Sequence, residues 1–216
     1  MTGSIRFVFV DIKTEMSENV KVISTEILSN NFFPLKKVKF EIEKKDGTTK
    51  ELNWEVYSSS NGATVLLYNK EKSSIILTRQ FRLTTYLNKN KTGMLLETCA
   101  GIVEENEEPK EAIIREIEEE TGYRIQEVKK VFEMYMTPGT VAEMLYFFVA
   151  EYTPEQKIND GGGLEDENED IEVIELPFKE AYDKLRSGEI KDAKTALLLQ
   201  NAKIEIFSEV KVFDVL

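Results

Sequence analysis

Residues 100–123, AGIVEENEEPKEAIIREIEEETGY, decide the fold of this chain. Pro109 suits the first turn of a helix, where its missing N–H costs nothing, and Gly122 suits the position just past a helix end. The pattern therefore predicts a helix over residues 108–121. Its buried stripe would consist of four apolar side chains: Ala112, Ile113, Ile114 and Ile117.

The opposite face of this predicted helix is strongly acidic. Glu116, Glu119 and Glu120 lie three and four residues apart and therefore share one face. Like charges at this spacing repel each other by roughly 0.2–0.5 kcal/mol per pair, and the C-terminal end of a helix also disfavours anions. Nothing in the local sequence compensates for this repulsion, so the face is a candidate functional site where a divalent cation would supply the compensation.

The amino-acid composition excludes several classes of function. The 216 residues include no histidine and carry a formal net charge of −12. The absence of histidine excludes Ser-His-Asp and Cys-His catalysis and His-ligated zinc, so any proton transfer must use carboxylates, Lys, Tyr or metal-bound water. The acidic balance argues against nucleic-acid binding, because no basic surface is available to neutralise phosphates.

Two features bear on cellular location. Cys99 is the only cysteine, so an intramolecular disulfide is impossible and a reducing compartment is expected. No apolar run reaches the length of a transmembrane helix, and we interpret residues 5–10 as a strand rather than part of a signal peptide. We therefore expect a cytoplasmic protein without a membrane partner.

Hydrophobic periodicity predicts two domains, residues 1–58 and 59–216. The first is an antiparallel strand meander, in which residues 35–42 and 49–57 flank an Asp-Gly turn. The second mixes strands and helices, so the fold class is expected to be α+β with a mixed sheet. Its expected elements are strands at 63–68, 74–79, 94–98, 128–136, 144–152 and 171–176, and helices at 177–187 and 192–201.

Residues 101–123 also match a known signature at every fixed position. The order is Gly101, five residues, Glu107, seven residues, Arg-Glu-Ile, one residue, Glu-Glu, one residue, and Gly122-Tyr123. This pattern resembles the box of the Nudix hydrolase family. The resemblance implies an α/β/α sandwich that binds divalent metal beside a nucleoside diphosphate linked to another group. The alternative of a solvated acidic helix would not require the two glycines and the arginine at these offsets.

The resemblance also implies a site for Mg²⁺, with Mn²⁺ as the alternative ion. Glu116 and Glu120 would be primary metal ligands and Glu119 an additional or bridging one. Carboxylate oxygens suit both ions, which would neutralise a diphosphate and acidify an attacking water. Arg115 would fix the geometry between helix and loop by pairing with a carboxylate of the box such as Glu107.

Further segments resemble the branch of the family that cleaves nucleoside diphosphate sugars: residues 79–82, 97–101, 135–139 and 161–167. The group in that branch that acts on GDP-mannose is similar at residues 28–33, 62–69 and 188–195. Carried over by position, the resemblance implies substrate contacts from Arg82, Ala100, Gly101, Ile102, Glu120, Glu143, Asp166, Glu167 and Lys194. The meander, which crosses to the partner subunit in relatives, would add Phe32, Asn53, Trp54 and Glu55. The Ala100 carbonyl and Glu167 would complete the metal ligands.

A catalytic carboxylate is expected in the loop after the glycines at 161–163, which would act as a hinge. Glu167 is the first candidate. Glu169 is the second, because the register of the loop can shift by two residues. Together with Glu116 and Glu120, these are the predicted catalytic residues.

Several of these residues could instead have a structural role that does not involve substrate. Arg82 could belong to a surface ion pair, Glu143 could be an ordinary strand carboxylate, and Trp54 could pack in a core rather than stack on a base. Two positions depart from the relatives, which carry glycine at Thr140 and tyrosine at Phe32. Both departures bear on the preference for nucleotide and sugar rather than on the chemistry.

The sequence therefore predicts a homodimeric, metal-dependent pyrophosphohydrolase that acts on a nucleoside diphosphate sugar. The first expectation for its substrate is GDP-mannose, which would give GMP and mannose 1-phosphate. The alternative substrate is ADP-ribose. A second class, a regulator that binds nucleotide sugars without hydrolysis, usually has an eroded box, whereas the box is complete here.

Overall fold

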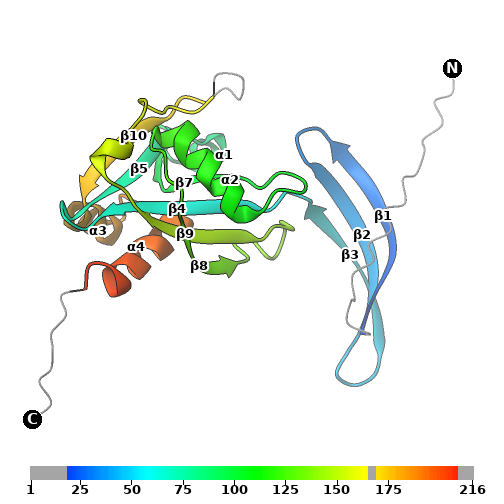
Figure 1. Cartoon of the computed structure of the whole chain (residues 1–216). Coiled ribbons are helices and arrows are strands. Elements are labelled where there is room, and N and C mark those ends of the chain that lie inside the picture. Colours follow the sequence, from blue (N-terminus) through cyan, green and yellow to red (C-terminus); the bar gives the residue numbers. More distant parts are fainter. Residues whose placement is uncertain (1–18, 165–168, 209–216) are drawn as a thin grey trace, which may run out of the picture. The chain divides into compact units, whose positions relative to one another are not determined.

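The computed structural model describes residues 19–164 and 169–208. The chain forms two compact units, residues 1–59 with 137–143 and residues 60–136 with 144–216 (Figure 1). The strand expected at residues 5–10 and the last eight residues of the chain lie outside the described part. Among the described residues, no helix is long and apolar enough to cross a membrane.

The first unit contains the predicted meander. Three antiparallel strands pair in the order β1-β2-β3: β1 (Val20–Asn30), β2 (Pro34–Glu43) and β3 (Thr49–Tyr57). The turn between β2 and β3 holds Gly47 at φ +79°, and the Asp46 carboxylate accepts the Thr48 N–H at 3.0 Å. Tyr57 also donates its N–H to the Thr140 carbonyl at 2.8 Å. This contact joins residues 137–143 to the unit.

The second unit is built on a mixed sheet with the strand order β10-β5-β4-β9-β8. The central pair, β4 and β9, is parallel, whereas the other pairs are antiparallel. Two short strands extend the sheet, since β6 pairs with β5 and β7 pairs with β4. The strands are β4 (Gly62–Asn69), β5 (Ser74–Phe81), β6 (Met94–Glu97), β7 (Cys99–Ile102), β8 (Lys129–Met134), β9 (Leu145–Glu151) and β10 (Glu172–Pro177).

Helices cover both faces of this sheet (Figure 1). The described helical elements of this unit are α1 (Leu83–Leu87), α2 (Pro109–Glu116), a π-helical turn η1 (Ile117–Thr121), a 3-10 turn η2 (Pro154–Gln156), α3 (Phe178–Ser187) and α4 (Ala193–Glu205). On one face Val65 and Leu67 of β4 pack with Ile113 of α2. On the other face Leu66 packs with Leu198 of α4. Alternate residues of one strand thus enter two cores, and the predicted α+β class with an α/β/α layering is confirmed.

The structure differs from the prediction at three places that frame the site. The expected strand 94–98 is two strands, because the chain leaves β5 after Glu97 and pairs with β4 from Cys99 onward. The expected helix 108–121 ends in the π-helical turn, where the Thr121 hydroxyl donates to the Ile117 carbonyl at 2.5 Å. Helix α1 was not expected; it buries no side chain and so lacks the apolar period that marks a helix.

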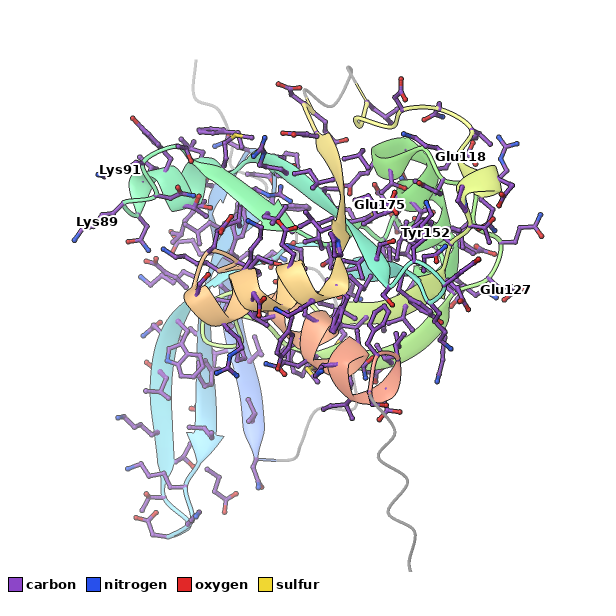
Figure 2. The ribbon with its side chains drawn as sticks, turned by 90° about the vertical axis from the view of Figure 1, so that its left-hand side faces the viewer. Lys89, Lys91, Glu118, Glu127, Tyr152 and Glu175 are labelled. Carbon is purple, nitrogen blue, oxygen red and sulfur yellow. The ribbon has the colours of Figure 1, made fainter. Side chains whose placement is uncertain are left out.

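The two ends of the loop between β9 and β10 meet at a buried tyrosine. Tyr152, directly after β9, lies beside Glu175 of β10 (Figure 2), with its hydroxyl 2.7 Å from the Glu175 carboxylate. Ser74 Oγ lies 2.7 Å from the same hydroxyl and donates to Glu175 at 2.8 Å. Burial and the Glu175 carboxylate raise the pKa of Tyr152, although the hydrogen bond with Ser74 opposes the shift, so the phenol stays protonated and donates to the carboxylate. The first residue of the loop is therefore tied by hydrogen bonds to the strand that follows the loop.

Candidate active site

The acidic box begins where α2 approaches β7. A Cβ at Gly101 would lie 1.9 Å from the Glu116 carboxyl carbon, so only glycine lets this carboxylate lie against β7. Gly122 takes φ +75° just past the π-helical turn, as its predicted position requires. Glycine is therefore required at position 101 to leave room for the Glu116 carboxylate, and at position 122 to allow a positive φ.

Arg115 connects the loop to the acidic face. Its Nε donates to Glu107 at 3.3 Å, which agrees with the pairing that was expected. Its Nη1 donates to Glu116 and to Glu119, both at 2.9 Å. Its Nη2 donates to the Ile102 carbonyl at 3.3 Å. One guanidinium thus compensates for part of the repulsion between the carboxylates, so the expectation that nothing in the local sequence compensates for it was wrong.

Glu120 is the most buried acid of the box, with 1% of its surface exposed. Its carboxylate accepts the Ala100 N–H at 3.3 Å and contacts the Cys99 thiol. Burial, followed by the charges of Glu116 and Glu169, raises the pKa of Glu120 to about 8. Burial likewise raises the pKa of Glu116 to about 7, although Arg115 opposes the shift. A cation beside these two carboxylates would therefore stabilise their charged forms and lower both pKa values.

The donor set fits a hard divalent cation, but the side chains do not converge on one point. Among the residues that the structure describes, no three acidic or sulfur side chains form a cluster that could hold a metal. The reason is visible in the contacts, since Glu116 and Glu119 both turn to the Arg115 guanidinium. Buried carboxylates with raised pKa values beside backbone oxygens are nevertheless the donors that Mg²⁺ and Mn²⁺ prefer. Glu167, the further expected ligand, and Asp166 lie outside the described residues.

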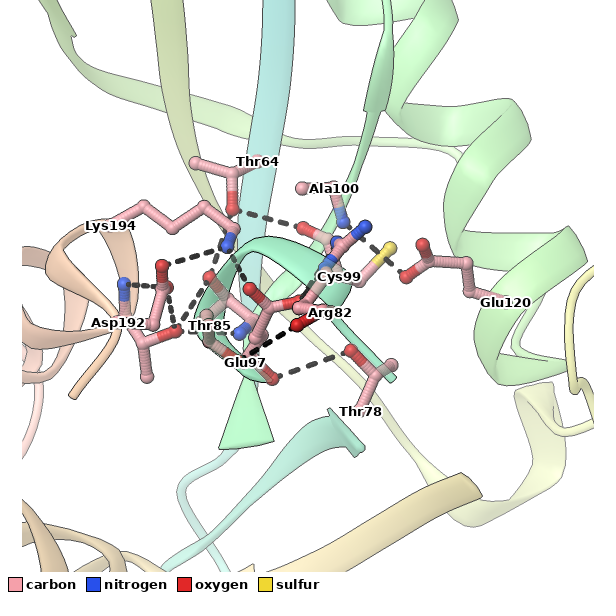
Figure 3. Close-up of polar contacts among 12 residues, drawn as sticks. Thr64, Thr78, Arg82, Thr85, Glu97, Cys99, Ala100, Glu120, Asp192 and Lys194 are labelled. Carbon is pink, nitrogen blue, oxygen red and sulfur yellow. Dashed lines mark hydrogen bonds and ion pairs between the residues drawn. The ribbon is translucent and has the colours of Figure 1, made fainter. Parts of the chain in front are cut away.

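A second cluster brings together the two cations that were expected to contact substrate. Arg82 donates from Nε at 2.9 Å to one oxygen of Glu97, and its Nη2 lies 2.8 Å from the same oxygen. Lys194 donates to the other oxygen at 2.8 Å and lies 2.9 Å from Asp192 (Figure 3). Glu97 is 3% exposed. Glu97 belongs to the segment 97–101, but no role in the site was predicted for it. Its signal in the sequence is a charged residue at the end of an apolar strand.

Hydrogen bonds tie this cluster to the first turn of α4. Asp192 caps the helix, because its carboxylate accepts from the N–H of Thr195 at 2.9 Å and from its hydroxyl at 2.6 Å. The Thr195 hydroxyl in turn accepts the Thr98 N–H at 2.7 Å. Thr64 Oγ1 donates to the Cys99 carbonyl at 3.0 Å (Figure 3). The corner between β6 and β7 is thus fixed from two sides.

The three glycines at 161–163 are attached to the end of the box helix. Gly162 donates its N–H to the Glu120 carbonyl at 2.9 Å, and Gly163 donates to the Glu119 carbonyl at 3.1 Å. All three glycines have positive φ, and a Cβ at Gly161 would lie 2.4 Å from the Glu120 carbonyl oxygen. The hinge role stays a prediction; the backbone contacts show where the loop is held.

The remaining predicted residues lie in the first unit. Phe32 and Trp54 are 80% and 56% exposed, which is unusual for large aromatic side chains. Phe32 contacts Phe33, and Trp54 contacts Phe40 edge-on at 5.4 Å. Asn53, Glu55 and Glu143 also belong to this unit. The roles of all five in substrate binding stay predictions.

Residues 59–198 match the family model described as the NUDIX domain. The chain belongs to the Nudix family. Residues 19–57 match the model of the GDP-mannose pyrophosphatase NudK N-terminal domain, so both units of this Nudix hydrolase have a counterpart in known families. The family is typically dependent on divalent metal, which agrees with the acidic face formed by the end of α2 and the turn η1.

Individual relatives agree with this assignment. The chain is 50% identical to a GDP-mannose pyrophosphatase of Shigella flexneri serotype 5b over 85% of its own length and 95% of the relative's. It is 49% identical to the GDP-mannose pyrophosphatase of Escherichia coli O157:H7 over the same shares. A crystal structure of an ADP compounds hydrolase superposes with a TM-score of 0.65 at 19% identity, covering 91% of this chain and 100% of that one. This last similarity shows a shared fold alone.

Proposed function

We propose that this Nudix hydrolase cleaves GDP-mannose to GMP and mannose 1-phosphate with Mg²⁺, or with Mn²⁺ in its place. The relatives at 49–50% identity support the substrate. The observation that carries the proposal is the corner of residues 97–100. At one end Glu97 holds Arg82 and Lys194, and at the other Ala100 contacts Glu120. Anion-binding and cation-binding groups therefore meet over four consecutive residues.

The acidic face holds the metal in this proposal. Glu116, Glu119, Glu120 and the Ala100 carbonyl would be the ligands, and the Gly101 backbone leaves room for Glu116 beside them. When bound, divalent cations neutralise the diphosphate and lower the pKa of an attacking water. The protein contributes the burial of the carboxylates and their fixed spacing on one helix turn.

Arg82 and Lys194 orient the diphosphate. An arginine fork matches phosphate oxygens with two parallel hydrogen bonds, whereas a lysine acts as a compact charge. The Lys194 side chain is 13% exposed and enters the site from α4. In this proposal it binds a different oxygen of the diphosphate from the one that Arg82 binds. The two cations would thus hold the substrate at two points.

A loop carboxylate orients and deprotonates the attacking water in this proposal. Of the two candidates, only Glu169 belongs to the described residues. Its charge contributes to the raised pKa values of Glu116 and Glu120, which supports a role for it beside the acidic face. It also accepts the Leu164 N–H at 3.2 Å. These contacts support Glu169 as a candidate general base, whereas Glu167, the first candidate from the sequence, lies outside the described residues.

The first unit closes the site in a homodimer in our proposal, with residues 1–58 as its dimerisation domain. The match of residues 19–57 to an N-terminal domain of GDP-mannose pyrophosphatase supports a specific role for this meander. The exposed Phe32 and Trp54 provide rings that could cover a base in the partner's site. Sedimentation velocity at micromolar concentration tests this part, and a monomer would contradict it.

Substrate preference is tested with a panel of nucleoside diphosphate sugars and ADP-ribose, each assayed with Mg²⁺ and with Mn²⁺. We expect the highest kcat/KM with GDP-mannose and products identified as GMP and mannose 1-phosphate. A large preference for ADP-ribose would overturn the substrate while leaving the chemistry in place. Activity without any divalent cation would overturn the proposed metal role.

A further inference from the structure

Glu97 is a buried acid with an unusual set of partners. Only 4% of its side chain is exposed, and each of its two oxygens accepts from a different cation. Oε2 accepts from Arg82 and Oε1 accepts from Lys194. A buried carboxylate is tolerated when it is paired and hydrogen-bonded in this way. Its position therefore depends on both cations, and theirs depends on it.

The charges of this cluster cancel. Arg82 and Lys194 each carry one positive charge, and Glu97 and Asp192 each carry one negative charge, so the formal sum is zero. Asp192 contacts Lys194 but caps α4 as well, whereas Glu97 is the acid that joins the two cations. The protein thus presents two phosphate-binding side chains without a net positive charge.

We propose that Glu97 is a positioning residue that sets both the spacing and the net charge of Arg82 and Lys194. The inference rests on the proposed function, because these two cations are assigned there to the diphosphate. The two oxygens of one carboxylate fix the distance between the cations. The negative charge prevents tight capture of any small anion, so that a substrate is retained by correct orientation rather than by attraction alone.

The variant Glu97→Gln tests whether Glu97 sets the spacing and net charge of the two cations or only supports the fold. An amide keeps the shape of the side chain, but it turns N–H donors toward one of the two cations and leaves the cluster with one net positive charge. Misplaced cations should lower kcat/KM for GDP-mannose by about 10- to 100-fold. The added positive charge should tighten the binding of inorganic pyrophosphate by about three- to tenfold.

Two further variants make the test specific. Glu97→Asp keeps the charge but shortens the side chain, so we expect lower kcat with unchanged affinity for pyrophosphate. Asp192→Asn keeps a helix cap and removes a carboxylate from Lys194 alone. It should therefore lower kcat/KM less than Glu97→Gln does. If either Glu97→Asp or Asp192→Asn folds poorly, the other can still be compared with Glu97→Gln.

A double-mutant cycle shows whether Glu97 acts through its partners. In an Arg82→Ala background, Glu97→Gln should lower kcat/KM at least about threefold less than it does in the wild-type protein, because one of its two targets is gone. Equal effects in the two backgrounds would show that the residues act independently and would overturn the proposal.

The deciding experiment combines kinetics with calorimetric titration of inorganic pyrophosphate at constant Mg²⁺. Lower kcat/KM together with tighter pyrophosphate binding in Glu97→Gln supports the proposal, because loss of fold would weaken both. Unchanged or weaker pyrophosphate binding overturns it. If the wild-type protein does not hydrolyse GDP-mannose, the proposed function fails, but the titration still decides whether Glu97 controls the charge of this cluster.

Discussion

The Lys194 ammonium lies 2.8 Å from the Glu97 carboxylate, although 97 residues separate them in the chain. Glu97 ends strand β6, whereas Lys194 lies in the first turn of α4. The contact therefore joins the sheet to a helix on one face of it, and the box helix α2 lies on the other face. The candidate site is assembled from elements on both sides of the sheet.

The first prediction is that Glu120→Gln raises the stability of the metal-free protein and lowers its activity. The variant removes a charge that is buried and has a raised pKa, so the metal-free protein should be more stable than the wild type at pH 8. Activity should fall by at least about 100-fold if the carboxylate is a metal ligand. Thermal melts of the metal-free protein measure the stability, and hydrolysis assays with Mg²⁺ measure the activity. Unchanged activity with Mg²⁺ would contradict the assignment.

The second prediction is a pH dependence of the metal-free protein. The pKa values of Glu116 and Glu120 rise from 4.5 to about 7 and about 8 on folding. Between pH 4.5 and 8 the folded state therefore binds more protons than the unfolded state, and the free energy of unfolding should decrease as pH rises. The expected loss is about 1.4 kcal/mol for each unit of pKa shift.

Urea unfolding at pH 5, 6, 7 and 8 in the presence of a chelator measures this decrease. Saturating Mg²⁺ should reduce the slope, because a bound cation stabilises the charged form of both carboxylates. Stability that rises with pH in the chelated protein would show that the two acids are not buried together as the structure describes.

The third prediction concerns the glycine contact with the box helix. Gly161→Ala should lower kcat/KM by at least about tenfold, because its Cβ would lie 2.4 Å from the Glu120 carbonyl oxygen and displace the loop or the helix end. Gly188→Ala is the matched control. Gly188 also has positive φ (+78°), but a Cβ there meets nothing within 4 Å. It should lose about 1 kcal/mol of stability and retain activity. Equal activities of the two variants would contradict a role for the contact.

The fourth prediction concerns the base of the loop. Tyr152→Phe removes the hydroxyl that contacts Ser74 and Glu175 and leaves part of their hydrogen-bonding capacity unsatisfied. The expected cost is about 1–3 kcal/mol of unfolding free energy. Chemical denaturation measures this cost, and Ser74→Ala is the companion variant. A double mutant whose cost equals the sum of the two single costs would argue against a shared network.

The box was predictable from sequence because its residues are near one another in the chain. The spacing of Gly101, Glu116 and Gly122 is local, so the helix, its two faces and the glycine past its end follow from pattern alone, whereas the π-helical last turn does not. The strand meander was predictable for the same reason, since β2 and β3 are joined by a short turn. The family resemblance rested on these local features.

The rest of the site depends on contacts between distant residues. Glu97 reaches Lys194 and Gly162 reaches the Glu120 carbonyl only after the sheet and helices have packed. The break between β6 and β7 arises because successive residues pair with different strands, which no period-two pattern records. The pairing of Tyr57 with the segment 137–143 is equally remote in the chain.

The most direct test of the central claim is the ratio of kcat/KM for GDP-mannose to that for ADP-ribose, measured with purified protein and Mg²⁺. We expect a ratio of at least about ten, with GMP and mannose 1-phosphate formed in equal amounts and activity lost on chelation. A ratio below one, or GDP and free mannose as the products, would contradict it.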